Sequence, residues 1–405
     1  MKESNTTLSP VSNYNVLFGG MRGICCLAIM LLHYPFKNIH LPVLPVYAFL
    51  HAFFIMSAYL VTRNLLIDKS RAKSFKQLLK IFYIKRTTRI FPAYFLYIFI
   101  MFAFAAVLYA VKGDTFGLGT EIKRYGWMLF TFTYNLKMWV ALHFNYDDYM
   151  KIIAFPHLWS MSLEEQFYLM IIFVAGLGSI RFLRMLCIVA IIIFPIVRIA
   201  GFFWISQETD DIFLRALLLM HSPFFQFDAF FYGIALCVFD FKKHKWMLYV
   251  MTTTGILILF FNFFNAYLCS HQEQVAIGHT LREERYMFNN GGIIFLDILV
   301  NTFFATWYLC LIHYPEKFKW LGSKLMTRMG DISYSMYIFQ FMCLFPGMIV
   351  AHLLSKYMSW YIADAVGVAV FFGLTYWVSA LVYKYVELPA LGIKDKYLKK
   401  VYAEK

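Results

Sequence analysis

Apolar stretches of about 20 residues recur along the chain, with short polar or basic segments between them. A helix of about 20 apolar residues spans the hydrocarbon core of a bilayer. The pattern therefore predicts an all-α polytopic membrane protein with a cytoplasmic segment 1–15, one transmembrane domain 16–386 and a basic cytoplasmic tail 387–405. The predicted spans are residues 16–35, 43–62, 90–111, 158–177, 185–200, 213–239, 246–268, 291–312, 331–352 and 360–383.

Stretch 122–142 is ambiguous, because it is aromatic and partly apolar but carries Lys123, Arg124 and Lys137. Lys and Arg gather in cytoplasmic loops, which gives a test. If the stretch does not cross, both termini are cytoplasmic, with 25 of the 37 basic residues inside and 9 outside. We therefore expect 112–157 to form one outer region, partly re-entrant or interfacial. The basic segment 63–89 is expected to lie as an amphipathic helix along the inner headgroups.

Composition narrows the class of protein further. The chain is 61% hydrophobic and only 15% charged, which excludes a soluble enzyme and a disordered chain. The net charge of +14 is explained by topology and by anionic lipid, so we expect the lipid bilayer as a partner and no nucleic acid. The histidines are scattered and lack Cys partners, so no metal site is expected.

Arg22 and His33 are the first candidates for chemistry, because ionisable residues inside a membrane are costly. Eleven helical residues make about three turns, which places both side chains on one face, about 16 Å apart. A cation at the inner end suits a phosphate, and an imidazole near the outer end suits general base work. The alternative is that Arg22 snorkels inward and His33 sits separately at the outer interface.

Two further clusters flank the predicted spans. Arg86 and Arg89 lie at the inner mouth of the third span, where they suit phosphate binding or merely set orientation, and Pro92 suits a first helical turn. Residues 157–168 enter the fourth span from outside, where Ser162 and Glu165 read as a capping box. Adjacent carboxylates exceed what capping needs, so we expect Glu164 or Glu165 to orient the His33 ring.

Weaker candidates lie elsewhere in the chain. His221 and Asp228 are seven residues apart in one predicted helix, and Asp228 alternatively pairs with Arg198 or Arg215. Segments 330–337 and 387–389 are simplest to interpret as a helix start and a helix stop. The residues that we assign to the acceptor side of a site are His157, Trp159, Asp228 and Tyr334.

Taken together, these motifs resemble those of the acyltransferase 3 family of membrane O-acyltransferases, and they occur in the family's order. The matching pieces are Met21-Arg22-Gly23 with His33, Phe53-Phe54-Ile55-Met56-Ser57-Ala58-Tyr59-Leu60, Arg86-x-x-Arg89-Ile90-x-Pro92-x-Tyr94, Trp159-Ser160-x-Ser162-x-Glu164-Glu165-x-Phe167-Tyr168, Phe227-Asp228 with Gly233, Ser333-Tyr334-Ser335-x-Tyr337 and Glu387-x-Pro389. The sequence departs from the family where Phe339-Gln340 replaces a frequent aromatic-His pair, where Gln226 replaces Arg, and where Ala58 replaces Gly.

The resemblance implies a membrane O-acetyltransferase of the cell (inner) membrane that moves an acetyl group from cytoplasmic acetyl-CoA to a hydroxyl of a glycan or glycolipid. It implies that Arg22 and His33 are needed; we expect Arg22, Arg86 and Arg89 to hold the CoA phosphates. Many relatives carry a C-terminal hydrolase-like domain, which this sequence lacks, so direct or partner-assisted delivery is expected. Two alternatives stay open: a transporter or flippase of a lipid-linked glycan, and a catalytically inactive partner.

Overall fold

The structure is a computed structural model that describes residues 13–36, 43–114, 117–144, 155–274 and 292–403. Its elements are α1 (Asn13–His33), α2 (Val43–Arg71), α3 (Phe75–Lys112), α4 (Leu118–Phe130), η1 (Tyr134–Leu136), α5 (Lys137–His143), α6 (Leu158–Leu177), α7 (Ile180–Glu208), α8 (Ile212–His221), α9 (Pro223–Gln226), α10 (Asp228–Val238), α11 (Trp246–Glu273), α14 (Gly292–His313), η4 (Pro315–Gly322), α15 (Lys324–Leu354), α16 (Trp360–Val382), η5 (Tyr383–Glu387) and α17 (Leu388–Ala403). The described residues contain no strand, and nine of their helices are long and apolar enough to cross a membrane. The predicted all-α polytopic class is confirmed.

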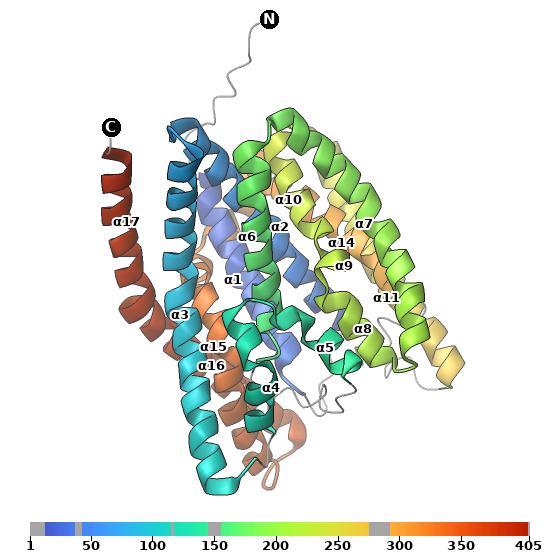
Figure 1. The fold of residues 1–405 in the computed structure, drawn as a ribbon. Coiled ribbons are helices and arrows are strands. Elements are labelled where there is room, and N and C mark those ends of the chain that lie inside the picture. The colour runs from blue at the N-terminus through green and yellow to red at the C-terminus, as the bar shows by residue number, and fades with distance from the viewer. Residues whose placement is uncertain (1–12, 37–42, 115–116, 145–154, 275–291, 404–405) are drawn as a thin grey trace, which may run out of the picture.

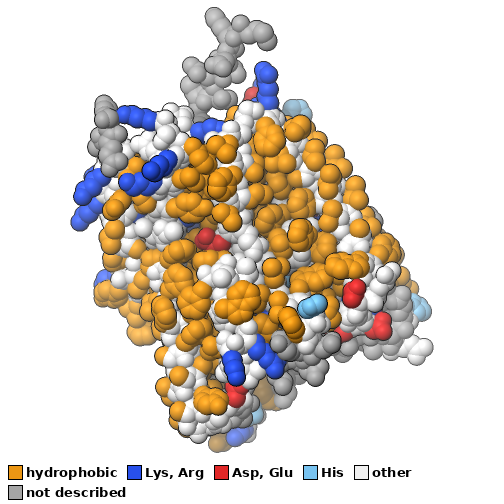
Figure 2. Space-filling view, in the orientation of Figure 1, with side chains coloured by type: hydrophobic (Ala, Val, Ile, Leu, Met, Phe, Trp, Pro, Cys, Tyr) orange, Lys and Arg blue, Asp and Glu red, His pale blue; other side chains and the backbone are white. Residues whose placement is uncertain are grey.

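The helices run up and down in one bundle, and α1 begins at the end of the bundle where α17 finishes (Figure 1). This agrees with the prediction that both termini lie on the same side. Figure 2 shows a broad apolar surface over the bundle, with Lys and Arg gathered at the end where α2, α3 and α17 meet. By the positive-inside rule, that end is the inner one. The apolar faces of α7 and α11 carry many exposed large side chains, as expected of helices that face lipid.

The predicted span 213–239 is wrong as a single helix, because it is broken into α8, α9 and α10. Pro223 has no N–H and cannot continue the hydrogen-bond ladder of α8. Arg198 of α7 donates to the carbonyl oxygen of Phe225 from Nε at 2.9 Å and from Nη2 at 2.5 Å. A buried guanidinium thus satisfies backbone that the break exposes, which is how broken helices are tolerated at membrane depth.

The expected amphipathic helix over 63–89 is also wrong. Instead, α2 continues to Arg71, the chain turns, and Ser74 caps α3, accepting a hydrogen bond from the backbone N–H of Gln77 at 3.2 Å. The apolar side chains of this segment pack on neighbouring helices rather than on a membrane surface; Ile81 clusters with Leu398 and Val401 of α17. Pro92 therefore lies inside the 38-residue α3 and not in a first turn.

The outer region 112–157 follows the prediction in its described residues, because α4 has 13 residues and α5 has seven, too few to cross. The chain reverses after α4 through Phe132, whose φ of 52° is unusual for a side chain of its size. The Phe132 carbonyl accepts a 2.9 Å hydrogen bond from Nε2 of Gln166 in α6. Before α4, the Thr120 hydroxyl and the backbone N–H groups of Gly119 and Thr120 lower the pKa of Asp114.

Helix α1 is held in the middle of the bundle against α15. The backbones approach so closely that a Cβ built on Gly330 would lie 1.9 Å from the carbonyl oxygen of Gly19. A side chain at this glycine would therefore push α1 and α15 apart.

Helix α16 does not stop at Glu387-Leu388-Pro389 as expected; a π-helical turn, η5, leads directly from its C-terminal end into α17. That turn directs Glu387 inward, towards α3 and α15.

Candidate functional site

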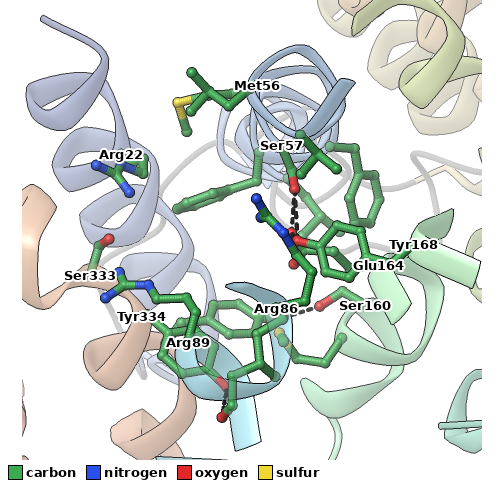
Figure 3. A pocket seen from close by; sticks show the side chains of 18 residues that line it. Arg22, Met56, Ser57, Arg86, Arg89, Ser160, Glu164, Tyr168, Ser333 and Tyr334 are labelled. Atoms are coloured by element: carbon green, nitrogen blue, oxygen red, sulfur yellow. Dashed lines mark hydrogen bonds between the residues drawn. The ribbon is translucent and has the colours of Figure 1, made fainter. Parts of the chain in front are cut away.

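A cavity of about 170 Å³ lies inside the bundle between α1, α2, α3, α6 and α15. Arg22 enters it from α1, and Arg86 and Arg89 enter it from α3. Figure 3 shows the guanidinium groups of Arg22 and Arg89 on one side of the cavity, Arg86 across its middle, and Glu164, Tyr168 and Ser57 opposite. We call this space the arginine cavity. The three predicted cations are therefore brought together, although α1 and α3 are far apart in sequence.

The three arginines differ in how their charge is balanced. Arg89 is paired, because its Nη1 lies 2.6 Å from Oε2 of Glu387. Arg22 makes no ion pair or hydrogen bond with the described residues, and its Nε is buried without a partner; the charge of Asp331 acts on it from further away. Arg86 likewise has a buried Nε without a partner in this part of the chain, and it faces the ring of Tyr168 at 5.4 Å. Neither of these half-buried guanidiniums thus makes an ion pair with the described residues, although the charge of Glu165 acts on Arg86.

Glu164 belongs to the arginine cavity and not to the neighbourhood of His33. Its carboxylate accepts hydrogen bonds from the hydroxyls of Ser57 and Tyr168. Glu165 is close enough to Arg86 and Glu164 for their charges to act on it, and its Oε1 is buried without a partner among the described residues. Both carboxylates lie inside α6, and no capping box forms, because α6 begins at Leu158 and the Ser162 hydroxyl donates to the Leu158 carbonyl at 3.3 Å.

His33 ends α1, about three turns from Arg22 along one continuous helix. Its Nδ1 lies 3.0 Å from Oε1 of Gln340 in α15. The expectation that Glu164 or Glu165 orients this ring is therefore corrected: the orienting contact in the structure is Gln340. The Glu164 carboxylate is held at the arginine cavity by hydroxyls of α2 and α6, and Glu165 lies near Arg86.

His157 is the predicted acceptor-side residue that does lie beside His33. The Phe341 ring separates the two imidazoles, with its centroid 4.8 Å from that of His33 and 4.7 Å from that of His157. His157 is buried, and its Nε2 lies 3.0 Å from the carbonyl oxygen of Ile338. We call His33, His157, Gln340 and Phe341 the histidine site.

Tyr337 joins the histidine site to the arginine cavity. It lines the cavity, its hydroxyl donates to the His157 carbonyl at 2.8 Å, and it contacts the Ser160 hydroxyl at 2.5 Å. Its own carbonyl accepts a 2.9 Å hydrogen bond from Nε2 of Gln340. One residue of α15 therefore forms the wall between the two sites.

The other acceptor-side candidates lie apart from the histidine site. Tyr334 lines the arginine cavity, donates to the Ile90 carbonyl at 2.8 Å and lies under Arg89. Trp159 stacks on His221 with a centroid distance of 4.4 Å. Asp228 is buried in an ion pair with Arg198 at 2.7 Å, so the alternative of a structural partner is the one observed.

That ion pair is part of a larger cluster that the sequence did not reveal. Asp297 lies 3.4 Å from Arg198 and 3.6 Å from His51, and His51 lies 2.8 Å from Asn301. All of these side chains are buried. We call Arg198, Asp228, Asp297, His51 and Asn301 the ion-pair cluster. Asp297 and Asn301, four residues apart in an apolar stretch, were the available signal, because that spacing puts both on one helix face.

Comparison with known proteins connects this geometry to a family. The model of a family described as an acyltransferase domain, acyltransferase 3, matches residues 17–384. The match covers nearly the whole chain and includes every residue of the arginine cavity and the histidine site. Neither the curated proteins nor the solved structures contain a significant match.

Proposed function

The chain belongs to the acyltransferase 3 family, and on that premise we propose that it transfers an acetyl group from cytoplasmic acetyl-CoA to a hydroxyl of a cell-envelope or secreted glycan. Family membership and the membrane-spanning helices make the protein a multi-pass membrane acyltransferase. The donor, the acceptor and residence in the cytoplasmic membrane are the proposed parts.

One observation carries the donor assignment: three arginines converge on one cavity, and two of them, Arg22 and Arg86, make no ion pair with the described residues. A partly buried guanidinium without an ion pair is costly, so the cavity favours a ligand that supplies negative charge. Arginine binds phosphate through forked hydrogen bonds, which suits the nucleotide end of CoA. The cavity of about 170 Å³ is too small for a whole CoA, so the donor must extend beyond it.

The proposed mechanism places the thioester near the histidine site. The pantetheine arm runs from the arginine cavity past Tyr337 along the roughly 16 Å between Arg22 and His33. Neutral His33 takes the proton of the acceptor hydroxyl while the oxygen attacks the thioester carbonyl carbon. The new C–O bond forms, the C–S bond breaks, and the imidazolium returns its proton to the CoA thiolate. This general base step is worth about 10²–10⁴-fold in rate.

The test replaces His33 with Ala and compares it with His143→Ala, a change at an exposed histidine of the outer region. Each variant is reconstituted in vesicles, with labelled acetyl-CoA supplied to the inner face and glycan O-acetylation measured. We expect His33→Ala to lower transfer about 10²–10⁴-fold without loss of membrane protein, while His143→Ala keeps transfer. Normal acetylation by His33→Ala would overturn the assignment. Glycan movement without any labelled ester would instead support a transporter.

A further inference from the structure

The side chain of Gln340 is held between His33 and the backbone of its own helix, α15. It is fully buried on α15, and its two amide atoms have different partners. The Nε2 atom donates to the Tyr337 carbonyl at 2.9 Å, and Oε1 lies 3.0 Å from Nδ1 of His33. A carbonyl oxygen accepts hydrogen bonds only, so the amide nitrogen must face Tyr337 and the amide oxygen must face His33. The orientation of this side chain is therefore decided by its hydrogen bonds.

The orientation of Gln340 determines which nitrogen of His33 carries the proton. The amide oxygen can only accept, so Nδ1 of neutral His33 must be the donor. The lone pair then lies on Nε2, the atom for which no described residue supplies a partner. We propose that Gln340 is a positioning residue, which holds His33 in the Nδ1–H tautomer so that Nε2 receives the proton of the acceptor hydroxyl. This inference rests on the proposed function of His33 as general base.

The neighbouring histidine is held in the opposite tautomer by the same helix. His157 Nε2 donates to the Ile338 carbonyl at 3.0 Å, which leaves Nδ1 as its unprotonated atom. That Nδ1 is buried, without a partner among the described residues, and closed off from solvent. Residues 337–341 of α15 thus fix both imidazoles, and only His33, which is half-buried, can present a free lone pair to a substrate.

The charged and titratable groups around His33 are few in the described structure. His157 faces it across Phe341, Tyr34 follows it in the chain, and Asp364 of α16 acts on Tyr34. Among the described residues, a new carboxylate at position 340 would be the only one in direct contact with the ring. It would stabilise the imidazolium and shift the acidic limb of the activity–pH profile to higher pH, by about one unit or more.

The experiment compares Gln340→Glu, Gln340→Met and the unchanged protein. For Gln340→Glu we expect the acidic limb of kcat/KM to move to higher pH. For Gln340→Met we expect kcat to fall roughly tenfold, as for one lost hydrogen bond, with little change in the KM for acetyl-CoA. Gln166→Met is the control, because it removes another glutamine amide that donates to a carbonyl, that of Phe132. Its pH profile should keep the original acidic limb.

A second readout does not depend on transfer. Carbethoxylation requires an unprotonated imidazole nitrogen, so the rate at His33, followed by peptide mass spectrometry across pH, reports its protonation directly. Gln340→Glu should move the midpoint of this curve to higher pH, and Gln166→Met should not. If both readouts are unchanged in Gln340→Glu, the positioning role is wrong. If the curve shifts but the unchanged protein transfers no acetyl group, the proposed function fails and the tautomer assignment stands.

Discussion

The arginine cavity and the ion-pair cluster both place arginines deep among membrane helices, but they balance the charge differently. In the ion-pair cluster, Arg198 is fully buried, pairs with Asp228 and Asp297, and donates to the Phe225 carbonyl. In the arginine cavity, Arg22 and Arg86 each have a buried Nε without a partner among the described residues. Removal of one partner from a buried ion pair is strongly destabilising, whereas a charge beside a cavity that has no ion pair favours the binding of an anion.

This contrast separates structural from functional charge more sharply than burial does. Arg22 and Arg198 both lie inside apolar stretches, and hydropathy treats them alike. The presence or absence of ion pairs distinguishes them, and these contacts join helices that are distant in sequence. In the ion-pair cluster, α7 meets α10 and α14; in the arginine cavity, α1 meets α3. The comparison predicts opposite effects of arginine removal on stability and on donor binding.

The largest expected effect is that of Arg198→Met. The change leaves Asp228 and Asp297 buried near each other without their cation and frees the Phe225 carbonyl at the break before α10. Breaking a buried ion pair from one side costs about 3–5 kcal/mol of unfolding free energy. We expect a much lower melting temperature in detergent and little protein in the membrane. Arg181→Met, at an exposed position of the same helix, is the control and should melt as the unchanged protein does.

The contrast would break if Arg198→Met melted normally and instead lost affinity for acetyl-CoA. The ion-pair cluster would then be part of a ligand site, and its compensated charges would not be a sign of a structural role.

A smaller effect in the opposite sense is expected for Arg22→Ala. Removing a half-buried cation that has no ion pair in the described structure should leave the melting temperature unchanged or raise it. Acetyl-CoA binding, measured by calorimetry, should weaken roughly 10- to 100-fold, because hydrogen bonds to charged groups are worth about 1.5–3 kcal/mol. Arg181→Ala should bind normally. Equal donor affinity in Arg22→Ala and the unchanged protein would refute Arg22 as a phosphate contact.

The sequence predicted the class, the same-side termini and the non-crossing outer region, because these follow from hydropathy and the distribution of Lys and Arg. The prediction that Arg22, Arg86 and Arg89 lie close together is confirmed, and it followed from their positions at the inner ends of spans. The sequence misplaced Glu164. A position in the N-terminal half of a predicted span gives the depth of a carboxylate, but it does not show which neighbouring helix supplies the hydroxyls that bind it. It assigned no role to Gln340, since a departure from a family motif does not show which side chain the new residue contacts.

It also could not foresee the break between α8 and α10. Pro223 lies in an apolar run, and the guanidinium that satisfies the exposed backbone comes from a separate helix, α7. Such tertiary compensation has no local pattern, and the same holds for the pairing of His51 with Asp297.

The smallest expected effect is that of Lys85→Met. This variant tests whether Lys85 differs in role from the two arginines that follow it in the same basic motif. Lys85 does not line the arginine cavity; its Nζ binds both carboxylate oxygens of Asp68, at 2.8 and 2.7 Å. The Lys85 side chain is 25% exposed, so solvent partly screens the pair, and Asp68 keeps the hydrogen bond from the Tyr402 hydroxyl; loss of Lys85 should therefore cost less unfolding free energy than loss of Arg198. We expect a melting temperature slightly lower than that of the unchanged protein and unaltered calorimetric affinity for acetyl-CoA. A donor affinity reduced as strongly as in Arg22→Ala would instead show that the whole inner basic surface holds the donor, and that the absence of an ion partner is not what marks the binding arginines.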